Sequence, residues 1–260
     1  MDQARKVLEN QFKLSDWRPG QEGVISRLLA GKNTAAIFPT GGGKSLCYQL
    51  PSQLLDGLTV VVSPLMALMK DQVESLVRRG IPAVRIDSSL SAEEHRQVIH
   101  AVREGKTKLL YVAPERFFNE RFREFLKGLR ISLFAIDEAH CISEWGHDFR
   151  PDYMEIASVR EQFPDAVCLA LTATATKQVR EDIVRNLRMK DPAVLVASFN
   201  RENIFLEVQP KRDAFSQTVD CINKHKDESG IIYCFSRKEV DQVTQGLIDM
   251  GYSALNYHAG

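Results

Sequence analysis

The chain has 260 residues, 44% of them hydrophobic, and its 34 basic residues match its 34 acidic residues, so its formal net charge at pH 7 is zero. A neutral chain has no overall field that would attract a polyanion, so any nucleic-acid site must be local. The longest apolar runs are far too short to cross a bilayer, and nothing resembles a signal peptide, so we expect a cytosolic protein without a membrane partner.

Short runs rich in β-branched residues alternate with helical patterns along most of the chain. This alternation is typical of α/β proteins with a parallel sheet flanked by helices. Ser91 and Glu94 form a capping box that begins a helix ending at Gly105, while Gly31 and Gly80 end two earlier helices. The predicted strands are 34–38, 58–62, 83–86, 108–112, 132–137, 166–172 and 193–197.

The last part of the chain indicates the start of a second unit. We expect strands at 204–210, 230–237 and 253–257, with a helix before each of the last two. Three strands are fewer than a sheet usually has, so this unit is expected to be truncated. The predicted domains are therefore residues 1–203 and 204–260.

The five cysteines are dispersed and include no C-x-x-C pair. This spacing does not suggest a disulfide framework or a zinc cage. We expect reduced thiols in or near the core at Cys47, Cys141, Cys168, Cys221 and Cys234.

A glycine-rich segment, FPTGGGKSLCY, follows the first predicted strand. Thr40, Gly41, Gly42 and Gly43 form a stretch of nearly bare backbone whose N–H groups can converge on an anion, and the next helix adds its positive end. Lys44 would then reach the outer phosphates and Ser45 would ligate Mg²⁺. Phe38 occupies the first glycine position of the P-loop pattern, and a flexible glycine hinge is the structural alternative.

Two adjacent carboxylates, Asp137 and Glu138, end the fifth predicted strand. Ligands of parallel sheets gather at the carboxyl ends of strands, where Lys44 and Ser45 also lie. Asp137 would hold the Mg²⁺, and Glu138 would orient and deprotonate a water molecule. The alternative is an inert surface pair.

A histidine, His140, follows this pair. It is interpreted as a coupling residue that hydrogen-bonds across the site, or else as a satisfied core histidine. With Cys141 and His147 it lacks a fourth ligand at zinc spacing, so we expect no zinc site here.

The motifs taken together resemble those of a known family. Six of them occur in the order seen in superfamily-two helicases, and two more, WRPGQ and CISEWGHDFRPDY, are similar to segments of the RecQ family of DNA helicases. The resemblance extends from about residue 8 to the end and implies a RecA-like P-loop motor domain, the start of a second one, and ATP with Mg²⁺ as cofactors. The six motifs are PTGGGKS, SPLMALMKDQ, APER, DEAH, LTATAT and IIYCFSR.

The resemblance assigns adenine recognition to Arg18 and Gln21. A glutamine amide suits this role because its donor and acceptor can pair with the adenine edge together. Two positions depart from the family. Lys13 stands where glycine usually follows Phe12, and Leu14 stands where an aromatic residue often stacks on the base.

The resemblance makes CISEWGHDFRPDY the aromatic-rich loop that links DNA contact to ATP hydrolysis. Trp145 and Phe149, beside Arg150, suit stacking on unpaired bases. The alternative is that these two aromatics form one helical face that packs inward.

Further DNA contacts follow from the same resemblance. Ser63 and Arg116 are predicted to contact the backbone of a single strand, which fixes position without reading sequence. Thr172 and Thr174 are predicted coupling residues, with strand-end caps as the alternative. The spacing of Leu65, Leu68 and Met69 indicates core residues.

The function that this resemblance implies is the N-terminal motor part of an ATP-dependent DNA helicase acting in repair or recombination. Its expected partners are single-stranded and partly duplex DNA, its expected state is monomeric, and its expected location is the bacterial cytoplasm with the nucleoid or the eukaryotic nucleus. The later motifs, with the arginine that reaches the γ-phosphate, are expected beyond Gly260, so a non-catalytic binding module is the alternative. WRPGQ and the aromatic segment disfavour an RNA helicase.

Overall fold

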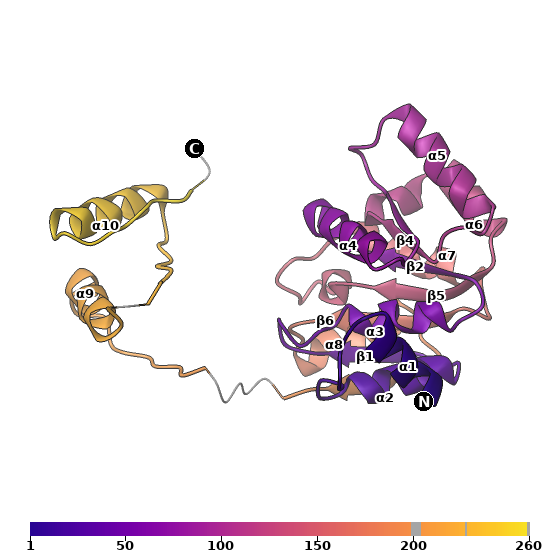
Figure 1. Ribbon diagram of the computed structural model, residues 1–260, viewed down its shortest axis with the longest axis horizontal. Coiled ribbons are helices and arrows are strands. Elements are labelled where there is room, and N and C mark those ends of the chain that lie inside the picture. The colour runs from indigo at the N-terminus through magenta and orange to yellow at the C-terminus, as the bar shows by residue number, and fades with distance from the viewer. Residues whose placement is uncertain (199–203, 227, 259–260) are drawn as a thin grey trace. The chain divides into compact units, whose positions relative to one another are not determined.

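The computed structural model describes residues 1–198, 204–226 and 228–258. The chain divides into two compact units, Met1–Arg201 and Glu202–Gly260 (Figure 1). The boundary predicted near Asn203 lies outside the described residues.

The first unit is built on a seven-stranded sheet in which every pair of neighbouring strands is parallel, in the order β3-β4-β2-β5-β6-β1-β7. All seven predicted strands of this unit are confirmed, each within one residue of its expected bounds. The strands are β1 (Thr34–Ile37), β2 (Leu58–Val62), β3 (Ala83–Ile86), β4 (Leu109–Val112), β5 (Ile131–Ile136), β6 (Val167–Thr172) and β7 (Ala193–Val196).

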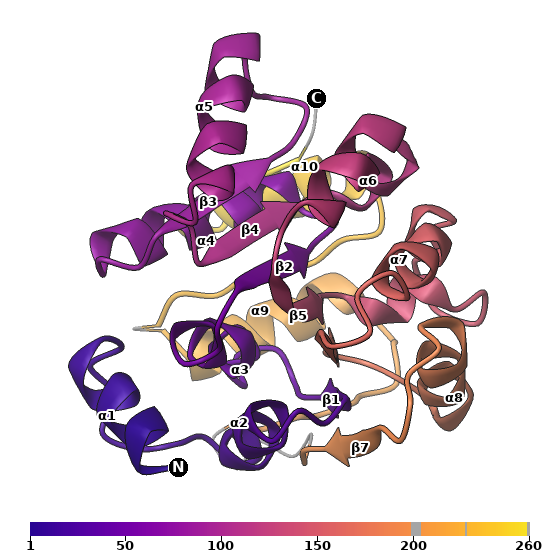
Figure 2. The same cartoon turned by 90° about the vertical axis from the view of Figure 1, so that its right-hand side faces the viewer.

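Helices cover both faces of this sheet, as Figure 2 shows with α7 and α8 on one side and α1 and α3 on the other. Successive strand residues point to opposite faces, so Val60 and Val62 belong to one apolar cluster and Val61 to a second one. The helices are α1 (Asp2–Asn10), α2 (Gln21–Leu29), α3 (Leu46–Gln49), α4 (Met66–Arg78), α5 (Ala92–Arg103), α6 (Glu120–Lys127), α7 (Asp152–Arg160) and α8 (Lys177–Asn186), with short 3-10 turns η1 (Pro51–Gln53), η2 (Pro114–Phe118) and η3 (Ala139–Ile142).

The predicted helix ends are also confirmed. The Ser91 hydroxyl accepts the Glu94 N–H at 3.2 Å, and the Glu94 carboxylate accepts the Ser91 N–H at 2.8 Å, which completes the capping box of α5. Gly31, Gly80 and Gly105 follow their helices with φ of 73°, 74° and 68°, the left-handed region that favours glycine.

The second unit contains α9 (Ala214–Lys224) and α10 (Arg237–Asp249), and its described residues include no strand. The three strands predicted at 204–210, 230–237 and 253–257 are therefore wrong. A strand is stabilised by pairing with a neighbour, and none of these runs is paired. Their apolar side chains stay exposed, for example Phe205, Phe235 and Tyr257 at 86%, 102% and 97%.

Three of the cysteines, Cys47, Cys141 and Cys168, are buried as expected. Cys234 is half-buried, whereas Cys221 is exposed, so the core assignment is wrong for Cys221. It lies on α9, where only Val219 is buried. No helix in the described part of the chain is long and apolar enough to span a membrane.

Candidate nucleotide and nucleic-acid site

The site lies at the carboxyl edge of the sheet, where four neighbouring strands end. In the order β2-β5-β6-β1, these strands are followed by Ser63, Asp137, the 172–176 segment and the glycine-rich loop. The sheet order thus brings together motifs that are more than a hundred residues apart in the chain. Parallel α/β proteins bind ligands at this edge.

The glycine-rich loop contains two glycines in the left-handed backbone region. Gly41 and Gly43 have φ of 80° and 74°, which an L-residue adopts at a cost. A Cβ atom on Gly42 would lie 2.9 Å from the Pro39 carbonyl oxygen, and one on Gly43 would lie 2.4 Å from Nε2 of Gln21. A side chain at Gly42 would therefore clash with the backbone, and one at Gly43 would require the Gln21 side chain to move.

The two departures near this loop have structural explanations. Phe38, in place of the first P-loop glycine, is buried in the core at 1% exposure, so its side chain contributes to packing. Lys13, in place of a family glycine, has φ of 57°, the left-handed conformation that glycine adopts without strain. Leu14 is 43% exposed and presents an apolar surface.

Arg18 and Gln21 contact the glycine-rich loop directly. The Gln21 side-chain oxygen accepts the Arg18 N–H at 2.8 Å, and Nε2 donates to the Gly43 carbonyl at 2.9 Å. The Arg18 guanidinium donates to the Gly41 carbonyl, and Lys44 Nζ donates to the Phe38 carbonyl at 3.4 Å. The Gln21 amide would therefore have to exchange these partners to pair with adenine.

The two carboxylates have opposite electrostatic environments. Burial, and then the nearby charge of Glu138, raise the pKa of Asp137 to about 6. The hydrogen bond to His140 lowers the pKa of Glu138. Opposite shifts in neighbouring carboxyl groups are typical of sites that divide tasks between them. Glu138 also has φ of 47°, an uncommon conformation that turns the chain into η3.

His140 connects the ends of β5 and β6. Its Nδ1 atom lies 2.8 Å from the Thr172 hydroxyl and 3.3 Å from the Glu138 carboxylate, and its ring stacks on His147 with 4.2 Å between centroids. The Thr172 hydroxyl accepts the Thr174 N–H at 3.3 Å. The expected hydrogen bond of His140 across the site is present, and the histidine is also buried, at 5% exposure.

The aromatic segment after η3 is not helical and does not pack inward. Trp145 is 75% exposed and Phe149 is 38% exposed, so the interpretation of a buried helical face is wrong. Arg150 pairs with Asp148 at 3.1 Å. The aromatic side chains are available for a partner.

The base of this segment is anchored by residues that sequence reasoning missed. The buried Ser143 hydroxyl donates to the buried Asp182 carboxylate of α8 at 2.6 Å and accepts the Trp145 N–H at 3.2 Å. Asp182 also accepts from Arg185 at 2.5 Å. In the sequence, the one feature that indicates this anchor is Asp182, a carboxylate on the inward side of an amphipathic helix.

The remaining predicted DNA contacts lie along the other half of this edge. Ser63 is buried directly after β2, and the Arg116 guanidinium in η2 donates to the Asp87 carbonyl at 2.7 Å. Met69 is core, at 1% exposure, but Leu65 and Leu68 are 42% and 50% exposed. The core assignment is therefore wrong for these two leucines, of which Leu65 precedes α4 as its N-cap.

A cavity of about 350 Å³ at this edge of the sheet has Thr40, Glu138, His140 and Thr174 in its wall. Ser45 and Asp137 carry side-chain oxygen atoms, the type of ligand that Mg²⁺ prefers. The described residues contain no cluster of three His, Cys, Asp or Glu that could hold a metal by itself.

Comparisons with known proteins support the same family. The model of the DEAD/DEAH box helicase family matches residues 18–183. The ATP-dependent DNA helicase RecQ of Haemophilus influenzae is 43% identical over 257 residues, which cover 99% of this chain and 42% of that protein. The ATP-dependent DNA helicase Q1 of Pongo abelii is 43% identical over 268 residues, covering 98% of this chain and 41% of that protein.

The fold has a matching solved structure. The DUF1998 helicase MrfA bound to DNA has a TM-score of 0.74 at 16% identity, covering 96% of this chain and 38% of that one. The chain spans about two fifths of the length of the curated relatives that it matches. The predicted resemblance to RecQ helicases is thus confirmed. The chain belongs to the DEAD/DEAH box helicase family, and its sequence is similar to those of the RecQ DNA helicases.

Proposed function

We propose that this chain is the N-terminal motor part of a RecQ-like DNA helicase, which binds Mg-ATP at the glycine-rich loop and single-stranded DNA along the same sheet edge. The observation that carries the proposal is the chain of contacts Glu138–His140–Thr172. It joins the carboxylate beside the glycine-rich loop to the strand end that leads into α8. Nucleotide state and DNA contact can therefore influence each other through one short path.

The proposed chemistry divides the work between neighbouring groups. Ser45 and Asp137 would hold Mg²⁺, which neutralises phosphate charge when bound. Lys44 would leave the Phe38 carbonyl for the outer phosphates. Glu138, whose lowered pKa keeps it ionised at neutral pH, would accept the proton of the attacking water.

The DNA-binding part of the proposal uses Trp145 and Phe149 as stacking platforms and Arg150 as a cation beside them. Stacking is worth about 1 to 3 kcal/mol per base and tolerates any sequence. Ser63 and Arg116 would contact the backbone. We propose a monomeric motor that acts in the cytoplasm of a bacterium or the nucleus of a eukaryote.

Unwinding is proposed for the whole protein rather than for these 260 residues. The arginine that the resemblance assigns to the second motor domain increases the rate of hydrolysis by a factor of about 10³ to 10⁵, or roughly 4 to 7 kcal/mol of transition-state stabilisation. We therefore expect this chain alone to bind Mg-ATP weakly and to turn it over slowly.

The test is ATP turnover by the chain with and without single-stranded DNA, beside the variant Glu138→Gln, which removes the proposed base. We expect turnover at the level of the variant while labelled ATP still binds, and DNA-stimulated, Glu138-dependent turnover in the full-length protein. DNA-stimulated turnover by the 260 residues would contradict the need for a second domain. Full-length turnover that survives Glu138→Gln would contradict the assigned base, and a full-length protein that binds ATP without turning it over would favour a binding module.

A further inference from the structure

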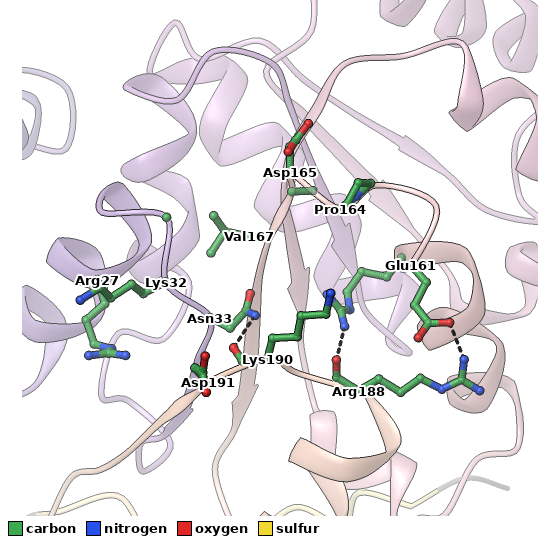
Figure 3. Close-up of a pocket in the computed structure, with 13 residues that line it drawn as sticks. Arg27, Lys32, Asn33, Glu161, Pro164, Asp165, Val167, Arg188, Lys190 and Asp191 are labelled. Carbon is green, nitrogen blue, oxygen red and sulfur yellow. Dashed lines mark hydrogen bonds and ion pairs between the residues drawn. The ribbon is translucent and has the colours of Figure 1, made fainter.

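A second, larger cavity lies at the opposite edge of the sheet, where β1, β6 and β7 begin (Figure 3). Its volume is about 810 Å³. It lies between the loop before β1, with Lys32 and Asn33, and the loop after α8, with Arg188 and Lys190. None of the residues assigned to ATP or DNA lines it.

The cavity wall carries an excess of positive charge. Five cationic side chains face three carboxylates, Glu161, Asp165 and Asp191, so two positive charges are in excess. Glu161 pairs with Arg188. Within the described ranges, the other four cations have no carboxylate at ion-pair distance: Arg27, Lys32, Arg160 and Lys190.

Arg160 is a buried cation with an unused donor. It is 8% exposed, and its Nη2 atom donates to the Leu187 and Arg188 carbonyls at 2.6 and 2.8 Å, beyond the end of α8. The two hydrogen bonds of Nη2 cap the end of this helix. The Nε atom takes no part in the cap, because it is buried and has no hydrogen-bond partner among the residues that the structure describes. Nε of Arg27 is in the same condition.

The Arg27 and Arg160 guanidinium groups cannot become neutral on burial, because an arginine stays protonated in proteins. A buried donor without a partner destabilises the folded protein. An anion in the cavity would neutralise the excess charge, and a rotation of the guanidinium group would bring such an N–H to one of its oxygens. Figure 3 shows the Lys190 side chain extending toward the side where Glu161 and Arg188 lie, so its ammonium group can contact the same anion.

We infer that this cavity is a binding site for a small anion that carries more than one phosphate group. Phosphate oxygens accept hydrogen bonds from several directions, and arginine and lysine are the side chains that bind them. The lining residues include no aromatic side chain, so a nucleobase would find no stacking surface. The site does not depend on the proposed helicase function.

The test uses pyrophosphate as the probe and the ¹⁵N-labelled chain with Lys44→Ala, which weakens binding at the glycine-rich loop. The side-chain Nε–H signal of Arg160, identified by its absence in Arg160→Lys, is expected to shift on titration. Lys190→Gln should weaken pyrophosphate binding about tenfold, the loss of one charge-assisted hydrogen bond. Lys6→Gln makes the same charge change on exposed α1 and should have no effect.

An unmoved Arg160 signal, or equal affinities of Lys190→Gln and Lys6→Gln, would overturn the proposal. A short single-stranded oligonucleotide distinguishes the other source of phosphate. A shift with the oligonucleotide and none with pyrophosphate would also overturn it, in favour of a nucleic-acid backbone. If Arg160→Lys does not fold, the comparison of Lys190→Gln with Lys6→Gln still decides.

Discussion

In the absence of ligands, the protein stabilises the ionised form of the Asp137 carboxyl group poorly. Its pKa is raised from 3.8 to about 6, first by burial and then by Glu138. Between these two values the folded state binds more protons than the unfolded state, so this group lowers the free energy of unfolding as the pH rises. The role proposed for Asp137 explains this loss of stability, because a bound Mg²⁺ would compensate for the buried negative charge.

Asp137→Asn is therefore expected to stabilise the nucleotide-free chain at pH 7, by about 1 to 3 kcal/mol. The gain should disappear near pH 4, where the wild-type carboxyl is protonated in the folded state. Thermal denaturation at the two pH values measures both effects. Asp71→Asn, which removes an exposed carboxylate of α4, is the control and should show no such pH-dependent gain.

Gly43 and Gly80 form a matched pair, because both have φ of +74°, but only a Cβ on Gly43 would meet another group, Nε2 of Gln21 at 2.4 Å. Gly80→Ala should cost about 1 kcal/mol, the conformational term alone. Gly43→Ala should cost more and should also weaken ATP binding. Urea denaturation gives the difference, and equal costs would show that Gln21 moves away freely.

At the scale of elements, the aromatic segment depends on α8 for its position. The Ser143 hydroxyl joins the Asp182 carboxylate to the Trp145 N–H. The aromatic segment is thus connected to α8, the helix that follows LTATAT. Helix α8 therefore helps to position Trp145, a role that the sequence of α8 does not indicate.

Ser143→Ala is expected to cost about 1 to 3 kcal/mol, because it leaves a buried carboxylate oxygen of Asp182 without a partner. It should also increase the motion of Trp145, measured by fluorescence anisotropy in a Trp17→Phe background, where Trp145 is the sole tryptophan. Ser26→Ala, on the exposed side of α2, is the control. Unchanged anisotropy in Ser143→Ala would show that the segment is held by other contacts.

At the scale of the whole molecule, the two units differ in how many of their apolar runs pair with a neighbouring strand and become buried. The strands of the first unit are paired and mostly buried. In the second unit, runs such as 230–235 carry exposed Ile231, Tyr233 and Phe235. These runs have strand composition without a neighbouring strand, which explains why composition alone predicted them wrongly.

The sequence by itself determined the seven strands of the first unit, the capping box of α5 and the membership of the helicase family. These features depend on the hydrophobic period, on residues a few positions apart, and on motif order, all of which are local or linear properties. The same features placed Asp137 and Glu138 at a strand end and Lys44 in the loop after the first strand.

The tertiary structure alone decided the strand order and the contacts that it creates. The Ser143–Asp182 hydrogen bond, the exposure of Leu65 and Trp145, and the cationic cavity around Arg160 each join or separate residues that are distant in the chain. Their outcome depends on which groups become neighbours after folding, and a linear pattern does not contain that information.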